Sequence, residues 1–226
     1  MVVSKILNRN FFKINTIRIL RSKFSFTSVN EKYANAIIGN YPNGYQKAAL
    51  LPLLDLAQRQ NGWVSVDVMH YVANFLSISR MSVYEVATFY TMFNRKPMGK
   101  YHVQICTCSP CMLGGIGSDR IVDAVKNHLK INFGETTKDD TFTLNECECL
   151  GACVNAPMVQ INDDYYEDLD ETSIVKILSD LGQGKKTKPG PQSQRKTCEP
   201  LKGPTSLISE IKVISEQFDF VSDKTK

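Results

Sequence analysis

Two stretches decide how this chain is organised: Cys106-Thr107-Cys108-Ser109-Pro110-Cys111 and Cys147-Glu148-Cys149-Leu150-Gly151-Ala152-Cys153. Together they hold six of the seven cysteines, and the seventh is Cys198. Thiolates are soft ligands that suit zinc and iron–sulfur clusters. The clustering therefore predicts one metal site built from both stretches.

Four kinds of site compete for these thiols. Structural disulfides are disfavoured in a reducing compartment. A redox dithiol would use the C-x-x-C of Cys108 and Cys111, which follows a predicted strand. Zinc is the usual metal for four cysteines at short spacing. A two-iron cluster needs two pairs of thiolates, one pair for each iron.

The spacing favours the two-iron cluster. Cys106-x₄-Cys111 and Cys149-x₃-Cys153 each supply a pair on a short turn. The small residues Gly151 and Ala152 let the backbone approach and donate N–H groups to sulfur. Spacing alone does not decide which four of the six thiols bind.

The N-terminal segment differs in composition from the rest of the chain. Six of the 27 basic residues and none of the 23 acidic residues lie within residues 1–27, so without this segment the formal charge of +4 would become −2. Its apolar residues recur at helical spacing, and serine and threonine follow, which is typical of an import signal. We therefore predict a mitochondrial transit peptide over residues 1–27, cleaved between about residues 21 and 28. A basic arm that touches a membrane or nucleic acid is the alternative.

The remaining chain predicts an α+β protein with two parts and a tail. Residues 30–97 have helical periodicity, which indicates a bundle of four short helices, with Pro52 kinking or dividing the second. Residues 98–182 alternate strand and helix patterns in the order β-α-β-β-α. Residues 183–226 predict an extended, Pro-rich tail that lies on a partner or stays mobile. No apolar run reaches about 18 residues, so we predict no membrane span.

Polar residues predict where several helices begin. Ser65, Ser79 or Ser82, and Asp170 or Thr172 precede apolar helical patterns, as N-cap residues do. Ser118 or Asp119 has the same position before the helix that follows Cys111.

Four strings of residues resemble one known family. They are residues 53–63 (LLDLAQRQNGW), 83–90 (VYEVATFY), 106–113 (CTCSPCML) and 149–158 (CLGACVNAPM). In this order they resemble the small iron–sulfur subunit of the flavoprotein fraction of mitochondrial complex I, the NADH:ubiquinone oxidoreductase. The resemblance covers roughly residues 30 to 205. It implies a helical bundle followed by a thioredoxin-like ferredoxin domain with one [2Fe-2S] cluster.

The resemblance also implies roles for individual residues and partners. Matched motif to motif, the ligands are Cys106, Cys111, Cys149 and Cys153, whereas Cys108 and Cys147 do not bind the metal. FMN and NADH are expected on the large flavoprotein partner, and a large iron–sulfur subunit is expected nearby. The implied place is the peripheral arm of complex I, on the matrix side of the inner membrane. We expect no catalytic acid, base or nucleophile, no nucleic-acid partner, and no NADH oxidation by the isolated chain.

Other assignments stay open beside this one. A zinc-stabilised assembly subunit, a thioredoxin-like reductase, and a subunit of an NAD-linked hydrogenase or formate dehydrogenase are the alternatives. The loop Gly114-Gly115-Ile116-Gly117-Ser118 is longer than the turn usual in the family, and it resembles part of a dinucleotide-binding loop without its third glycine.

Overall fold

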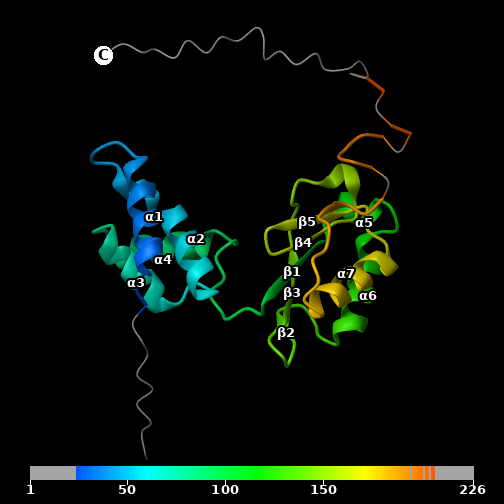
Figure 1. Cartoon of the computed structure of the whole chain (residues 1–226), viewed down its shortest axis with the longest axis horizontal. Helices are drawn as coiled ribbons and strands as arrows, with labels where there is room; N and C mark the ends of the chain where they lie inside the picture. The colour runs from blue at the N-terminus through cyan, green and yellow to red at the C-terminus, as the bar shows by residue number, and fades with distance from the viewer. Residues whose placement is uncertain (1–23, 194, 201, 204, 207–226) are drawn as a thin grey trace, which may run out of the picture. The chain divides into compact units, whose positions relative to one another are not determined.

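The structure is a computed structural model that describes residues 24–193, 195–200, 202–203 and 205–206. The chain divides into two units, one up to Pro97 and one from Met98 onwards (Figure 1). Most of the predicted targeting segment, residues 1–23, lies outside the described residues. In the described part of the chain, no helix has the length and apolarity that crossing a bilayer requires.

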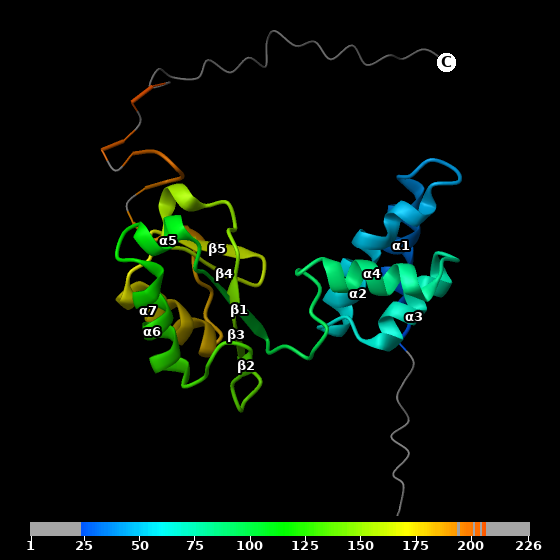
Figure 2. The same cartoon turned by 180° about the vertical axis from the view of Figure 1, so that it is seen from behind.

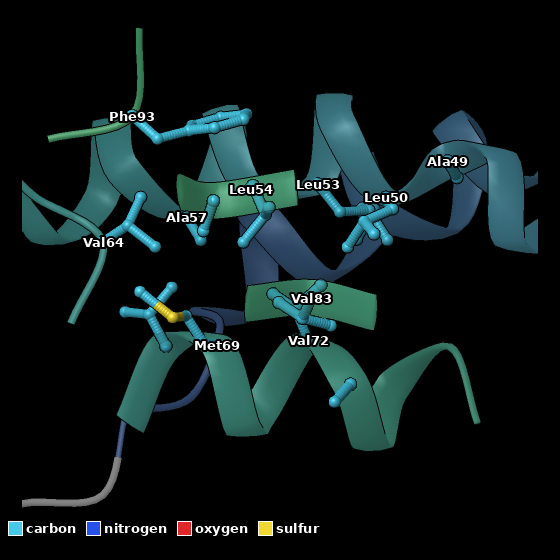
Figure 3. Packing of buried hydrophobic residues seen from close by; sticks show 14 of the residues in the cluster. Ala49, Leu50, Leu53, Leu54, Ala57, Val64, Met69, Val72, Val83 and Phe93 are labelled. Carbon is cyan, nitrogen blue, oxygen red and sulfur yellow. The ribbon is translucent and has the colours of Figure 1, made fainter. Parts of the chain in front are cut away.

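The first unit is helical because its apolar residues recur every three to four positions and meet in one core. Figure 3 shows Leu53 and Leu54 on one side of this core and Met69 and Val72 on the other. Its elements are α1 (Ser28–Gly39), the 3₁₀ helix η1 (Gln46–Ala49), α2 (Leu50–Asn61), α3 (Val66–Phe75) and α4 (Arg80–Phe89).

Side-chain caps fix where these helices begin. The hydroxyls of Ser65 and Ser79 accept hydrogen bonds from the backbone N–H groups three residues on, as the sequence predicts. The division expected at Pro52 lies two residues earlier, because the chain changes from η1 to α2 at Leu50. Pro52 thus stands in the first turn of α2, where no backbone N–H is needed.

The segment before α1 belongs to this unit. Phe26 is 7% exposed, and its ring lies 5.3 Å from the ring of Tyr71 and 5.7 Å from that of Phe75. Thr27 caps α1 by accepting from the N–H of Asn30. Phe24 and Phe26, which the sequence placed in the targeting segment, therefore pack in the helical core, and Thr27 caps its first helix.

The second unit is built on one mixed sheet with the strand order β2-β3-β1-β4-β5-β6. The central strand β1 pairs in parallel with β3 and antiparallel with β4, and β5 pairs in parallel with β6. The strands are β1 (Tyr101–Cys106), β2 (Glu135–Thr136), β3 (Phe142–Cys147), β4 (Val159–Ile161), β5 (Asp164–Glu167) and β6 (Gly190–Pro191).

Two helices cover one face of this sheet, α6 (Ser118–Leu129) and α7 (Glu171–Gly182) (Figures 1 and 2). The alternate residues Val103 and Ile105 of β1 point into the core between sheet and helices, together with Ile121 and Ile174. The parallel pair β1 and β3 requires a crossover, and α6 provides it. The predicted α+β class is confirmed.

The structure corrects some local expectations. α6 begins at Ser118 itself, so neither Ser118 nor Asp119 is the N-cap; that residue is Gly117, at φ 86°. A short helix α5 (Ser109–Leu113) and the strand β2 were not predicted. The first part of the C-terminal tail joins the sheet as β6.

Candidate metal centre

The first cysteines stand where two parallel strands end. Cys106 closes β1 and Cys147 closes β3, and they are direct neighbours in the register of the two strands. Carboxyl ends of parallel strands meet at one edge of a sheet, which places the loops that follow side by side. The sheet therefore fixes the start of both cysteine loops.

The loop after β1 turns at once into α5. Pro110 stands in its first turn, where proline is favoured. The N–H of Cys111 donates to the carbonyl of Cys108 at 2.8 Å, which turns the Cys111 side chain inward. Cys106 and Cys111 are both 1% exposed and pack with Met158.

The loop after β3 is more open. Cys149 is exposed, and its Sγ lies 3.3 Å from Sγ of Cys153. Gly151, at φ 85°, donates its N–H to the sulfur of Cys149 at 3.4 Å, which is the contact expected from the small residues of this loop. Cys153 begins a one-turn 3₁₀ helix, η2 (Cys153–Asn155).

The two loops are in close contact through Gly114. A Cβ at this position would come within 2.7 Å of both Cβ of Ala156 and the carbonyl oxygen of Pro110, so only glycine fits. The long Gly114–Ser118 turn thus brings the end of α5 against the segment after Cys153. From the sheet, the Tyr165 hydroxyl donates to the Leu150 carbonyl at 2.9 Å and holds the second loop.

The thiols influence one another's ionisation. Burial, followed by the hydrogen bond from Cys106, raises the pKa of Cys111 to about 12, and burial raises the pKa of Cys147 to about 12. The N–H of Gly151 lowers the pKa of Cys149, while the hydrogen bond with Cys149 raises the pKa of Cys153. The charge of Cys106 also acts on Cys153, so the two loops share one electrostatic environment.

The thiol pKa values bear on the redox dithiol alternative. Desolvation and the neighbouring Glu148 raise the pKa of Cys108 to about 11, and Cys108 Sγ lies 3.4 Å from Glu148 Oε2. A reactive C-x-x-C thiol needs a lowered pKa, because the thiolate is the nucleophile. The surroundings of Cys108 and Cys111 raise the pKa values of both thiols instead, so they do not favour a redox dithiol.

The donors fit an iron–sulfur cluster in chemistry and in pairing. Cys106, Cys108, Cys111 and Cys147 share one cluster at the end of the sheet, and Cys149 and Cys153 form a close pair on the adjacent loop. Among the described residues, no three or more His, Cys, Asp or Glu side chains already form a metal-binding group. Which four thiols bind stays a prediction, and Cys198 is exposed in the tail.

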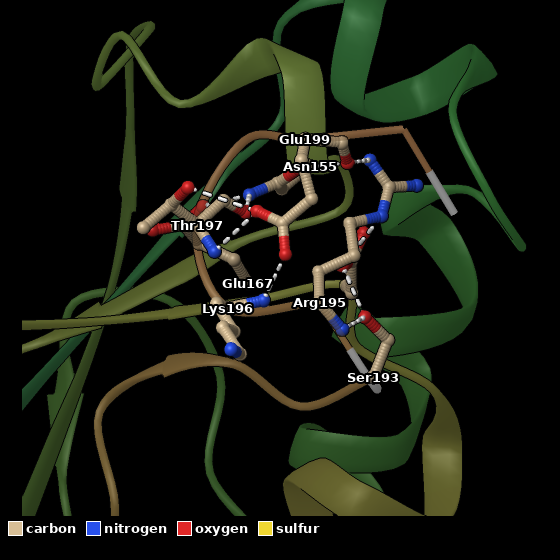
Figure 4. A network of polar contacts seen from close by, with 8 residues as sticks. Asn155, Glu167, Ser193, Arg195, Lys196, Thr197 and Glu199 are labelled. Atoms are coloured by element: carbon tan, nitrogen blue, oxygen red, sulfur yellow. Dashed lines mark hydrogen bonds and ion pairs between the residues drawn. The ribbon is translucent and has the colours of Figure 1, made fainter. Parts of the chain in front are cut away.

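Sequence reasoning missed a set of polar residues behind Cys153. Asn155, at the end of η2, is 2% exposed and hydrogen-bonded to the side chains of Glu167 and Arg195 (Figure 4). Arg195 lies 40 positions further along the chain, and no local pattern connects the two. Arg195, Cys153 and Gly115 also line a hollow of about 440 Å³.

Comparisons with known proteins agree with this geometry. A family described as thioredoxin-like [2Fe-2S] ferredoxin matches residues 34–182. The chain is 48% identical over 216 residues to NADH dehydrogenase [ubiquinone] flavoprotein 2, mitochondrial, of Dictyostelium discoideum, covering 89% of this chain and 87% of that protein. It is 56% identical over 162 residues to an NADH-quinone oxidoreductase subunit of Rickettsia prowazekii, covering 71% of this chain and 90% of that protein.

A solved structure shares the fold. An air-oxidised NAD+-reducing [NiFe]-hydrogenase superposes with a TM-score of 0.53 at 18% identity, over 60% of this chain and 23% of the hydrogenase chain. At that identity the likeness concerns the fold alone. With the family match across residues 34–182, the two close relatives, and two cysteine loops that follow neighbouring strands of the sheet, the chain belongs to the thioredoxin-like [2Fe-2S] ferredoxin family.

Proposed function

We propose that this chain is the [2Fe-2S] electron-carrier subunit of a respiratory NADH dehydrogenase, and that it exchanges single electrons with a flavin held by a partner. The observation that carries the proposal is a pair of cysteine loops at one end of the sheet: four thiols share one cluster, and Cys149 and Cys153 pair on the second loop. Two relatives, which match this chain over most of their length, are named as NADH dehydrogenase and NADH-quinone oxidoreductase subunits, and they support this assignment. An iron–sulfur cluster supplies one-electron redox chemistry when bound.

We assign Cys106, Cys111, Cys149 and Cys153 as the ligands. Cys106 and Cys111 are buried, so they keep water away from one side of the site. Cys149 is exposed and accepts the N–H of Gly151, which stabilises its thiolate. The Cys108 thiol is hydrogen-bonded to Glu148. We assign no ligand role to Cys108 or to Cys147. The chain supplies binding, orientation and electrostatics, and no acid, base or nucleophile.

The surroundings of the site suit a protein partner. Leu113 is 86% exposed and Val154 62% exposed, and they follow directly on Cys111-Met112 and Cys153. Exposed apolar groups beside a redox site favour docking, because a partner buries them and excludes water. We expect Leu113→Asp to weaken binding of the flavoprotein partner while iron content stays at the wild-type level.

The relatives support an inference about the partner and the location. We infer that the partner is the large flavoprotein subunit with FMN and NADH, that a large iron–sulfur subunit lies beside it, and that the assembly is the peripheral arm on the matrix side of the mitochondrial inner membrane. The mitochondrial relative and the basic, acid-free N-terminal segment support this location. Since Phe24 and Phe26 belong to the helical unit, we place the cleavage of the import signal before Phe24.

The test is a metal analysis of the chain purified without oxygen. Iron, acid-labile sulfide and zinc are measured together with the EPR spectrum after dithionite reduction. We expect about two irons and two sulfides per chain and an S = 1/2 signal. NADH should reduce this centre only when the flavoprotein partner is added. Stoichiometric zinc without sulfide, and no signal after reconstitution, would establish a structural zinc site instead.

A further inference from the structure

A segment of the C-terminal tail crosses the sheet unit behind the second cysteine loop. We call residues 190–193 and 195–199 the strap. It begins as β6, which pairs with β5, and the Gln192 N–H donates to the Glu167 carbonyl at 2.9 Å. Beyond this pairing, the strap is joined to the sheet unit through the side chains of two residues, Asn155 and Asp168.

Asn155 uses both ends of its amide. Its Nδ2 donates to Glu167 Oε2 at 2.7 Å and to the carbonyl oxygen of Thr197 at 2.9 Å. Its Oδ1 accepts from Arg195 Nη1 at 3.0 Å, and its backbone carbonyl accepts from the N–H of Asp168 at 2.7 Å (Figure 4). Two strap residues thus bond the side chain that ends η2.

Arg195 brings a positive charge into a largely buried place. Its side chain is 17% exposed, that of Asp168 is 11% exposed, and Nε lies 3.3 Å from Oδ2 of Asp168. Nε is buried and makes no hydrogen bond, so charge attraction holds this contact. Ser193 donates to the same carboxylate at 2.7 Å. Losing one partner of such a pair leaves the other charge uncompensated, which is strongly unfavourable.

The strap also fixes its own turn. The Glu199 carboxylate accepts from the N–H groups of Lys196 at 2.5 Å and Thr197 at 2.7 Å, and from the Thr197 hydroxyl at 2.9 Å. These bonds lower the pKa of Glu199 to about 2, so the carboxylate is ionised at neutral pH. The turn therefore presents the Thr197 carbonyl to Asn155 in one orientation.

The η2 turn has little support of its own. Within it, the N–H of Asn155 donates to the backbone carbonyl of Ala152 at 3.1 Å, and the N–H of Ala156 donates to the backbone carbonyl of Cys153 at 3.3 Å. Three residues of 3₁₀ helix are not stable in isolation. The orientation of Cys153, the first residue of the turn, thus depends on what holds Asn155, the last.

We propose that Arg195 and Asn155 are positioning residues of the metal centre, through which the strap holds Cys153 in the orientation needed for cluster binding. This inference rests on the proposed role of Cys153 as a ligand. Both residues act through the η2 turn rather than on the cluster itself. The strap is then part of the site, although it contributes no ligand.

The test compares Arg195→Gln and Asn155→Ala with a matched control in the full chain loaded with its cluster. The control is Arg120→Gln, which removes an exposed arginine that pairs with Glu171 at 3.5 Å in the same unit. The rate of iron loss to an added chelator, the EPR spectrum and amide hydrogen exchange over residues 149–157 are measured. We expect iron loss about tenfold faster in both strap variants, because a hydrogen bond to a charged group is lost. The control should match wild type.

The spectrum and the exchange locate the effect. We expect shifted g-values and faster exchange at residues 152–156, with β1 unchanged. Arg195→Lys should lie between wild type and Arg195→Gln, because its ammonium keeps the attraction to Asp168 without also reaching Asn155. If Asn155→Ala does not fold, the comparison of Arg195→Lys with Arg195→Gln still tests the inference.

Two outcomes would overturn the inference. Equal iron loss from Arg195→Gln and Arg120→Gln would show that the strap does not act on the site. A lowered melting temperature with wild-type g-values and iron loss would reduce the strap to general stabilisation. If wild type itself holds no iron and sulfide, the proposed function fails as well, whereas a loaded wild type with an inert Arg195→Gln removes this inference alone.

Discussion

The two units of this chain are ordered in different ways. In the helical unit, order comes from apolar side chains such as Leu53 and Val72 and from caps such as Ser65. In the sheet unit, the segment after β3 that carries Cys149 and Cys153 has little regular structure, and side chains from distant parts of the chain hold it. Asn155 is bonded to Glu167 and Arg195, respectively 12 and 40 positions away.

This difference shows which part of the molecule the proposed function constrains most. A helical core tolerates rearrangement as long as it stays apolar and filled, whereas a metal site needs sulfur atoms at fixed positions on loops. Loops gain such precision only from supporting contacts outside themselves. Substitutions should therefore separate the units: some remove the metal and leave the helices, and others unfold the helices and leave the metal.

The largest expected effect is loss of the metal centre in Cys111→Ser. Serine removes a buried thiolate from the first pair, and we expect labile sulfide to fall to background while Trp63 fluorescence, which reports on the helical unit, is unchanged. Cys108→Ser is the control, because its thiol is bonded to Glu148. If both variants lost sulfide equally, the ligand assignment would be wrong.

The reverse separation comes from Phe26→Ala. This ring is 7% exposed and meets Tyr71 and Phe75, so its removal should lower the stability of the helical unit by about 3 to 5 kcal/mol. Urea unfolding followed by Trp63 fluorescence measures the change. Phe89→Ala, at a ring that is 77% exposed, should change it by less than about 0.5 kcal/mol. If Phe26→Ala changed the stability only slightly, residues 24–27 would belong to the targeting segment and not to the helical unit.

Local patterns were enough to predict the regular elements. The alternation in β1, the caps at Ser65 and Asp170, and the apolar faces of α3 and α7 depend on neighbours within one or two turns. The cysteines were equally visible, because each pair lies within one short turn. The prediction failed at Ser118, where a chain with Gly117 at φ 86° enters the helix one residue early. The Ser118 hydroxyl is buried and donates to Met112 Sδ at 2.8 Å instead.

The contacts that hold the second cysteine loop could not be predicted from local patterns. Nothing near Asn155 indicates that its amide is bonded to residues in the tail, and the lysine- and proline-rich composition after Gly182 predicted a tail apart from the sheet. Pairing between residues 40 positions apart is set by the folded sheet, through β5 and β6. The sequence therefore shows where the thiols lie along the chain, but it does not show which side chains hold their loops.

A third effect concerns only the sheet unit and depends on pH. Burial lowers the pKa of His102 to about 4, and Asn145 Nδ2 lies 2.8 Å from its Nε2. Between pH 6.5 and 4 the unfolded chain binds a proton that the folded chain does not, so stability falls as pH falls. From pH 7 to 4.5 we expect the sheet unit to lose about 2 kcal/mol more in wild type than in His102→Gln.

Urea unfolding of the loaded proteins at both pH values, followed by visible absorbance, measures this difference. The pH dependence of the thiolates is common to both proteins and cancels in the comparison. His128→Gln, at an exposed position in the last turn of α6, should behave as wild type. Parallel curves for His102→Gln and wild type would contradict the assignment.

The smallest effect compares one cap from each unit. Ser65→Ala and Asp170→Ala should each cost about 1 kcal/mol, because each side chain accepts the N–H of the residue three positions on. The Ser65 cap does not ionise. The bond from the Ser173 N–H lowers the pKa of Asp170 below its usual 3.8, so this cap acts fully above that pH and weakens as pH falls through the folded-state pKa. Hydrogen exchange in α3 and α7, each variant against wild type at the same pH, should show that acid reduces the difference for Asp170→Ala only. An equal reduction for Ser65→Ala would mean that acid loosens both units together, and the two units would then not be ordered independently.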